Sequence, residues 1–324
     1  MRRHAVPLLA LLACLLAAAP AGAAKLLPPK GAVLQGVSGS TSPEPFRTEA
    51  RASLGVFGVF VAWNSLGDYV FRSTDAAAGR LMLHVSTARG QHLPETITPL
   101  EIARGRGDAY LLRINRAIAA WGRPTYVRLL AEMNQADNAY AGFDHSGRSR
   151  GRSHAPRTFR RAWRRAALIL RGGPLARIDA RLRRLGLPPV AGAPGDLPRP
   201  RLAMVWVPQT RGTPDIRANM PAAYWPGRRY VDWVGTDFYS RYPNFHWLEQ
   251  FYDRFGGKPF AFGEWALWGR DDPAFVRRLF RWVRTHRRVR MMLYNQGAQA
   301  GGPFRLSRYP RARGELRRQL RRHR

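Results

Sequence analysis

Two glutamates, Glu132 and Glu264, are the residues of this chain best placed to carry out acid–base chemistry. Each comes at the end of a short apolar run that predicts a buried strand, at residues 125–131 and 259–263. Side chains at the carboxyl ends of parallel strands meet at one mouth of a barrel, where catalytic groups are placed. Two carboxyl groups there can flank a glycosidic bond, about 5–5.5 Å apart for retention of configuration or roughly 6.5–9.5 Å apart for inversion.

The strand before Glu132 carries a second ionisable group. Side chains alternate between the faces of a strand, so Arg128, Leu130 and Glu132 are expected to share one face. Arg128 would lie deeper in the barrel than Glu132. We expect it either to tune the pKa of that carboxyl group or to form a structural ion pair.

Short apolar runs alternate with helical patterns along most of the chain, which is typical of parallel βα units. The runs predicted as strands are residues 31–37, 56–63, 81–86, 125–131, 202–207, 233–237, 259–263 and 289–294. The clearest helical patterns are residues 108–121, 157–170, 175–185, 273–285 and 314–322. Eight strands in this alternation predict the α/β class and a single-domain (β/α)8, or TIM, barrel, which takes about 250 residues.

Residues 1–23 have the three parts of a secretory signal peptide. A basic start precedes an apolar stretch at residues 5–19 and a small-residue cleavage signal at residues 21–23. About 15 apolar residues are too few to cross a bilayer, so no transmembrane segment is expected. Cys14 has a lipoprotein-like context, but the apolar run continues past it. We therefore favour simple cleavage near Ala23 and a secreted or cell-envelope protein.

Arginine dominates the charge of the chain. The formal net charge is +33, and lysine occurs only at positions 25, 30 and 258. Such a field attracts polyanions, so a nucleic-acid binder has to be weighed. Export and the dispersal of the arginines argue against specific nucleic-acid binding, and anionic envelope polymers fit better. We expect the barrel in residues 24–310, followed by an arginine-rich segment at residues 311–324 that docks on such polymers or is a solvated helical end.

The chemistry is expected to need neither a cofactor nor a metal. The only cysteine, Cys14, lies in the expected signal peptide, which leaves the mature chain without a disulfide, a thiol nucleophile or a thiolate metal site. His145 and His154 lie with Asp144 in a polar loop, residues 135–156, but their spacing fits no zinc pattern.

Four segments resemble glycoside hydrolase family 26, the β-mannanase family. Residues 128–134, Arg-Leu-Leu-Ala-Glu-Met-Asn, look like its acid/base segment, and residues 258–264 are similar to its nucleophile strand. Residues 231–239 resemble its sixth strand, where a tyrosine contacts the nucleophile. Residues 97–105 resemble the segment leading into its third helix. The resemblance runs from about residue 31 to residue 295.

The resemblance implies a retaining glycoside hydrolase that cleaves a β-linked polysaccharide by double displacement. Glu264 would be the nucleophile, Glu132 the general acid/base, and Tyr239 would hold Glu264 by a hydrogen bond. This division is physically coherent, because a hydroxyl donor favours an ionised partner while a drier pocket keeps a carboxyl group protonated.

Two features differ from the family pattern. Ala131 stands where members commonly carry a histidine, and residues 135–140 lack the tryptophans that form sugar platforms in many mannanases. The substrate therefore stays open among β-mannan, β-1,4-xylan, mixed-linkage β-glucan and another glycan. The alternative is a non-catalytic glycan-binding barrel of the cell envelope.

Other residues near predicted strand ends are candidates for contacting sugar. Tryptophans stack on pyranose faces, and asparagines or a histidine bind hydroxyl groups; the structural alternatives are rim packing, loop capping and a satisfied histidine. The candidates for substrate binding are Tyr239, Asn134, Trp206, Trp265, Trp268, Asn295 and His84. Asp237 is expected to be either a third active-site carboxylate or, as we favour, a residue that orients the groups in contact with substrate, and Arg128 is expected to lie behind those groups.

The helix predicted at residues 157–170 is basic and amphipathic. Its apolar stripe is made of Phe159, Trp163, Ala166 and Leu170. Such a helix can lie on a membrane surface, but we expect the stripe to pack against the barrel.

Overall fold

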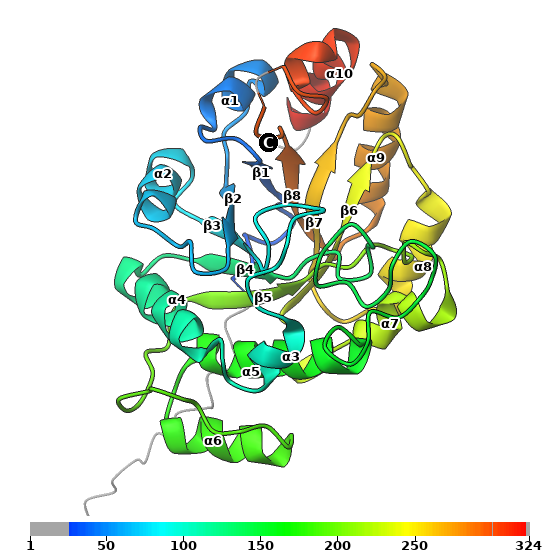
Figure 1. Cartoon of the computed structure of the whole chain (residues 1–324). Coiled ribbons are helices and arrows are strands. Elements are labelled where there is room, and N and C mark those ends of the chain that lie inside the picture. Colours follow the sequence, from blue (N-terminus) through cyan, green and yellow to red (C-terminus); the bar gives the residue numbers. More distant parts are fainter. Residues whose placement is uncertain (1–25, 300, 322–324) are drawn as a thin grey trace, which may run out of the picture.

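The computed structural model describes residues 26–299 and 301–321. Eight parallel strands form a closed barrel in which each strand pairs with its neighbours in chain order and β8 pairs with β1. Figure 1 shows the helices around this barrel. The strands are β1 (Leu34–Ser38), β2 (Val56–Ala62), β3 (Leu81–Ser86), β4 (Thr125–Leu129), β5 (Leu202–Trp206), β6 (Trp233–Tyr239), β7 (Phe260–Ala266) and β8 (Val289–Asn295). The predicted (β/α)8 barrel is confirmed.

Helices connect the strands on the outside of the barrel. The α-helices are α1 (Glu44–Ala50), α2 (Tyr69–Ala77), α3 (Pro99–Ala103), α4 (Asp108–Trp121), α5 (Pro156–Arg171), α6 (Leu175–Arg184), α7 (Pro221–Tyr224), α8 (Phe245–Arg254), α9 (Pro273–Thr285) and α10 (Pro310–Arg321). Short 3-10 turns occupy Arg217–Asn219, Arg228–Tyr230 and Leu306–Arg308. Figure 1 shows α6 set apart from the barrel, beyond α5.

Alternation along the strands divides the buried apolar side chains into two layers. In β3, Leu81, Leu83 and Val85 join the larger cluster between strands and helices, while Met82 joins a smaller cluster inside the barrel. Most members of the inner cluster lie in the first halves of their strands. The inner positions near the carboxyl ends are thereby left to polar residues such as His84.

The basic helix α5 packs as expected. Phe159, Trp163, Ala166 and Leu170 are all buried in the layer between strands and helices. The apolar stripe is therefore occupied by the barrel. No helix in the described part of the chain is long and apolar enough to cross a membrane.

The end of the chain differs from the expectation. Residues 310–321 do not form a separate arginine-rich segment but the last helix of the barrel, α10, which packs against α9 and α1. Leu316 and Leu320 are buried there, and the buried carboxylate of Glu315 accepts hydrogen bonds from Arg318 and Gln319, both at 2.6 Å. The helix has more anchors than its arginine-rich sequence suggested. The expected signal peptide, at residues 1–23, lies outside the described residues.

Candidate active site

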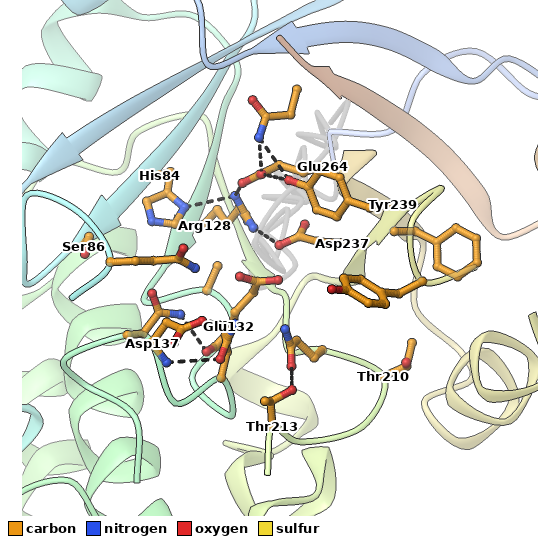
Figure 2. A pocket seen from close by; sticks show the side chains of 18 of the residues that line it. His84, Ser86, Arg128, Glu132, Asp137, Thr210, Thr213, Asp237, Tyr239 and Glu264 are labelled. Atoms are coloured by element: carbon orange, nitrogen blue, oxygen red, sulfur yellow. Dashed lines mark hydrogen bonds and ion pairs between the residues drawn. The ribbon is translucent and has the colours of Figure 1, made fainter. Parts of the chain in front are cut away.

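The carboxyl ends of the strands open into a groove of about 1090 Å³. Its wall includes Glu132 from the segment after β4, Asp237 and Tyr239 from β6, Glu264 from β7 and Asn295 from β8. Figure 2 shows Glu132 directed from one wall toward a cluster that contains Glu264, Tyr239 and Asp237. Residues from three strands and from the segment after a fourth thus meet at one place.

Glu132 is presented by a strained turn rather than by a strand. β4 ends at Leu129, and both Leu130 (φ 45°) and Glu132 (φ 51°) have left-handed backbone conformations, which cost a non-glycine residue of order 1 kcal/mol or more. Leu130 consequently packs in the outer layer, whereas Glu132 faces the groove. The expectation that Arg128, Leu130 and Glu132 share one face was therefore wrong for Leu130.

Hydrogen bonds hold this turn in place. The backbone N–H of Leu130 donates to the carbonyl of Val85 at 2.8 Å, and that of Glu132 donates to the carbonyl of Val207 at 2.7 Å. The hydroxyl of Tyr140 donates to the carbonyl of Ala131 at 2.6 Å. The neighbouring strands therefore fix the direction in which the Glu132 side chain leaves the backbone.

Glu264 reaches the groove through an irregularity in β7. Ala261 belongs to the inner cluster and Phe262 to the outer one, so strict alternation would turn Gly263 inward and Glu264 outward. The pairing of β7 with both neighbours shifts register here: Thr236 pairs with Phe262, but Asp237 pairs with Glu264. A bulge of this kind redirects a side chain, and Glu264 lines the groove directly after Gly263.

Gly263 is needed for this arrangement. A Cβ atom at this position would lie 3.0 Å from Nε of Arg128, 3.0 Å from Oδ1 of Asp237 and 3.2 Å from Val207. The missing side chain leaves room for Arg128 and Asp237 to meet beside Glu264.

Three donors converge on the carboxylate of Glu264. Arg128 Nη1 donates to Oε1, and the hydroxyl of Tyr239 donates to Oε2. Asn295 Nδ2 donates to Oε2 at 2.7 Å and to the Tyr239 hydroxyl at 3.0 Å. Together these groups hold both oxygens of the Glu264 side chain in place.

Arg128 links Glu264 to Asp237 and His84. Its second nitrogen, Nη2, donates to Asp237, and both side chains are 2% exposed. Its first nitrogen also lies 3.1 Å from Nδ1 of His84. Because a guanidinium group only donates, His84 accepts with Nδ1. Burial and then the charge of Arg128 lower the pKa of His84 well below its ordinary value, so this histidine is neutral.

The two glutamates differ in their surroundings. Burial, followed by the charge of Glu264, raises the pKa of Glu132 to about 7, although Arg128 opposes the shift. Burial also raises the pKa of Asp237 well above its ordinary value, again against Arg128. Burial, and then Glu264, raise the pKa of Tyr239, so its hydroxyl stays protonated as a donor. The site therefore combines a carboxyl group whose pKa is raised by burial with a second carboxyl group that accepts hydrogen bonds from three donors.

Solved structures with a similar barrel include β-mannanases. A double mutant of an endo-β-1,4-mannanase from Cellulomonas fimi has a TM-score of 0.59 and 16% sequence identity, over 90% of this chain and 71% of the other. A family 26 β-mannanase from Bacteroides ovatus has a TM-score of 0.57 and 14% identity, over 90% and 89% of the two chains. Neither a sequence profile of a protein family nor a curated protein sequence matches the chain.

This chain has a family 26-like barrel fold. At these identities the likeness extends to the fold alone. The carboxylate cluster is observed independently of it, from the contacts of the chain itself.

Aromatic rings border the groove of this family 26-like barrel. Trp268 lines it as predicted, and its ring contacts Tyr239 at 5.8 Å, Tyr242 at 5.7 Å and Phe304 at 5.2 Å between centroids. Tyr242 is 65% exposed and Trp247 is 36% exposed. Such faces can stack on sugar rings.

Two predicted sugar-binding tryptophans do not reach the groove. Trp206 is fully buried in the outer layer, where it packs against Trp225, Phe251 and Phe255. The neighbouring Val207 belongs to the inner cluster, so alternation directs Trp206 outward. The expectation of sugar stacking was therefore wrong for Trp206.

Trp265 also faces away from the groove. It is 1% exposed and packs against Phe280 of α9 and Tyr294 of β8. Because the bulge in β7 turns Glu264 inward, the next residue points outward into the helix layer. The predicted contact of Trp265 with sugar was therefore wrong, because the bulge in β7 that directs Glu264 into the groove directs Trp265 away from it.

Asn134 holds two loops together instead of binding substrate. Its side chain is fully buried, donates to the carbonyl of Gln209 at 3.1 Å and accepts from the N–H of Gln209 at 2.9 Å. It thereby ties the segment after β4 to the one after β5. The predicted contact of Asn134 with sugar was wrong, because both ends of its amide are used by the protein.

The remaining predicted site residues meet in the groove. His84, Arg128, Asp237, Tyr239, Trp268 and Asn295 all line it together with the two glutamates. Asn295 and Tyr239 contact Glu264 directly, which makes them positioning groups for that carboxylate. The sequence reasoning missed Gln209, which lines the groove and whose hydrogen bond to Glu132 opposes the rise of that pKa. Gln209 lies just after β5, and this position at the carboxyl end of a barrel strand could have indicated that it belongs to the site.

The histidine-containing loop shows no metal-binding geometry. His145 Nε2 lies 2.7 Å from Asp137, and Asp144 accepts hydrogen bonds within its own turn, from Ser146 at 2.7 Å and Arg148 at 2.9 Å. Among the described residues, no group of three or more histidine, cysteine, aspartate or glutamate side chains could hold a metal ion.

Proposed function

We propose that this protein is a retaining glycoside hydrolase that cleaves a β-linked polysaccharide, with Glu264 as nucleophile and Glu132 as general acid/base. The observation that carries the proposal is the difference between the two carboxyl groups. Burial raises the pKa of Glu132 to about 7, whereas Arg128, Tyr239 and Asn295 all donate to Glu264. One group can therefore be a proton donor while the other is an anion, as double displacement requires.

In the first step, protonated Glu132 gives its proton to the glycosidic oxygen as the bond from that oxygen to C1 breaks. A carboxylate oxygen of Glu264 forms a bond to C1, and the leaving sugar departs as an alcohol. Arg128, Tyr239 and Asn295 hold the attacking carboxylate in place, which lowers the entropic cost of reaching the transition state.

In the second step, Glu132 is a carboxylate and removes a proton from a water molecule. The water oxygen attacks C1, and the bond between C1 and Glu264 breaks. Glu132 is then protonated again and Glu264 ionised, so the enzyme returns to its starting state. Two inversions at C1 give net retention.

The substrate that fits best is β-mannan or a related β-glycan, such as xylan or β-glucan. The structural neighbours named above are mannanases, and the groove is bordered by exposed rings that suit an extended chain of sugars. Ala131 lines the groove beside Glu132, where family members commonly carry a histidine. This difference leaves undecided which sugar forms the backbone of the substrate. The signal-peptide pattern of residues 1–23 supports action outside the cytoplasm.

The proposal is tested by measuring reducing ends released from mannans, xylans and β-glucans. The wild type is expected to cleave at least one of them. The Glu264→Gln and Glu132→Gln variants should lose at least about 10²-fold in kcat/KM. Arg254→Gln, at the exposed end of α8, is the matched control and should keep full activity. Binding without cleavage by the wild type would instead support the non-catalytic glycan-binding barrel.

A further inference from the structure

Two arginines at the rim of the groove have no acidic partner. Arg241 follows β6, and Arg89 lies in the loop after β3 as part of the groove wall. Both are exposed. Across residues 26–299 and 301–321, no carboxylate forms an ion pair with either of them, although ion pairs are common elsewhere in the chain.

Arg241 is held against the aromatic border of the groove. Its guanidinium carbon lies 5.0 Å from the ring centre of Trp268 and 5.7 Å from that of Tyr242. Trp268 in turn contacts Tyr239, whose hydroxyl donates to Glu264. Two aromatic rings therefore lie between the positive charge of Arg241 and Glu264, and stacking on Trp268 limits the freedom of the Arg241 side chain.

A third rim arginine provides an internal comparison. Arg211 also lies over a groove-lining ring, 4.8 Å from the ring centre of Trp247, but it forms two hydrogen bonds of 2.7 Å to Asp215. Asp137, another carboxylate of the wall, is bound by His145 at 2.7 Å and by Gln135 at 2.8 Å. Asp215 and Asp137 are thus bound by other side chains of the protein. The guanidinium groups of Arg89 and Arg241 can therefore pair with an anionic ligand.

The centre of the groove has the opposite character. Glu132, Asp237 and Glu264 supply three carboxyl groups against the single guanidinium of Arg128. The guanidinium at the centre is already engaged by Asp237 and Glu264, so the free positive charges that attract an anionic sugar lie at the rim.

We propose that the groove is built for a β-glycan that carries uronic acid carboxylates, with Arg89 and Arg241 pairing with carboxylates on sugars that flank the cleaved bond. This inference rests on the proposed function for its cleavage readout, but its binding readout does not depend on hydrolysis. Guanidinium groups suit this task because their planar fork matches a carboxylate.

The test uses two matched polymers for each backbone. Glucuronic acid-bearing xylan and mannan are each compared with the same polymer after chemical reduction of its carboxylates to alcohols. This reduction removes the charge and keeps the linkages. Binding is measured by calorimetry and cleavage by reducing ends, at physiological salt to screen general attraction by the basic protein.

The variants are Arg89→Gln, Arg241→Gln and their combination, with Arg254→Gln as a control that removes the same charge at the other end of the barrel. The wild type is expected to bind at least one carboxylated polymer more tightly than its reduced form. Each rim substitution should lower the ratio of affinities for the carboxylated and the reduced polymer about two- to fivefold, the effect of losing one exposed ion pair. The double variant should lose the preference, and Arg254→Gln should keep it.

The outcomes separate this inference from the proposed function. Equal binding of carboxylated and reduced polymers by the wild type would overturn the inference, even if both are cleaved. A loss in Arg254→Gln as large as in the rim variants would also overturn it, because bulk charge would then be the cause. A carboxylate-dependent preference without any cleavage would support the inference and refute the proposed hydrolase.

Discussion

Arg128 and Glu264 form a buried ion pair that joins β4 to β7 across the carboxyl end of the barrel. The same guanidinium group also pairs with Asp237 of β6. One side chain therefore links the strand of the proposed nucleophile to the strand that precedes the proposed acid/base. This makes Arg128 the structural centre of the site, although it does not carry out a chemical step.

Replacement of Arg128 by methionine leaves two buried carboxylates without their partner. The free energy of unfolding should fall by roughly 3–5 kcal/mol, as for the loss of one member of a buried ion pair, and hydrolysis should be lost. Urea unfolding at pH 7 measures the change, with Arg254→Gln expected to stay within about 0.5 kcal/mol of the wild type. A loss below 1 kcal/mol for Arg128→Met would show that the carboxyl groups are neutral.

Activity should depend on the protonation of Glu132. Because burial and Glu264 raise the pKa of Glu132 to about 7, kcat/KM is expected to decline as the pH rises through this value and the general acid loses its proton. The pH profile of Glu132→Gln, measured with a substrate whose leaving group needs no protonation, should lack this decline. A wild-type profile that stays flat up to pH 9 would contradict the assignment of Glu132 as the acid.

The raised pKa of Glu132 also has a consequence for stability. The folded state binds the proton of the Glu132 carboxyl group more tightly than the unfolded state does. Protonated Glu132 therefore adds to the free energy of unfolding at low pH, and this contribution is lost as the pH rises from about 4.5 toward 7. Glutamine cannot ionise, so Glu132→Gln should be more stable than the wild type at pH 8, on the order of 1–3 kcal/mol, and nearly equal at pH 4.5. Unfolding curves at both pH values check this. Parallel pH dependence in the two proteins would refute it.

Most of the barrel follows from the sequence pattern, because each buried strand needs a continuous apolar run and each helix an apolar stripe. The predicted bounds of β3, α4 and α9 match the structure. Strand ends near the site were less predictable. β4 stops at Leu129 because Leu130 turns left-handed, and the N–H groups of this turn donate to the carbonyls of Val85 and Val207, which lie far away along the chain.

Side-chain direction at the site depends on a bulge that strict alternation along the strand does not predict, although Gly263 is a local sign of it. The bulge in β7 turns Glu264 inward and Trp265 outward, and it arises from pairing with β6 and β8. The strand-end position identified Glu264 correctly, but the same logic misplaced Trp206 and Trp265. For Trp206, alternation with the inward-facing Val207 would have predicted an outward side chain, whereas its place at the strand end did not.

The two kinds of tryptophan should respond differently to substitution. Trp268→Ala removes a ring at the groove and should raise KM, with a small effect on stability. Trp206→Ala empties a buried site and should lower the free energy of unfolding by about 3–5 kcal/mol, with KM unchanged in the protein that remains folded. Steady-state kinetics and urea unfolding of both variants test the assignment. A rise in KM for Trp206→Ala alone would restore it as a sugar-binding residue.

Part of the arginine excess has a structural role. Arg150 donates to the carbonyls of Ala136, Asn138 and Ala139, at 2.6 to 3.1 Å, and so fastens the long loop after β4. Arg290 similarly donates to the carbonyl of Ala32 at 2.9 Å, ahead of β1. A guanidinium group offers five donors, so one arginine can satisfy several loop carbonyls. The guanidinium groups of Arg150 and Arg290 thus stabilise the fold through hydrogen bonds to backbone carbonyls, in contrast to those of Arg89 and Arg241.

The role of Glu264 is tested most directly by trapping the covalent intermediate. The protein is incubated with a 2-deoxy-2-fluoro glycosyl fluoride of the sugar found in the polysaccharide screen, and the digested protein is mapped by mass spectrometry. We predict a single glycosyl adduct on the peptide that contains Glu264, absent in Glu264→Gln. An adduct on Glu132 or Asp237, or active hydrolysis with inverted products and no adduct, would contradict the mechanism.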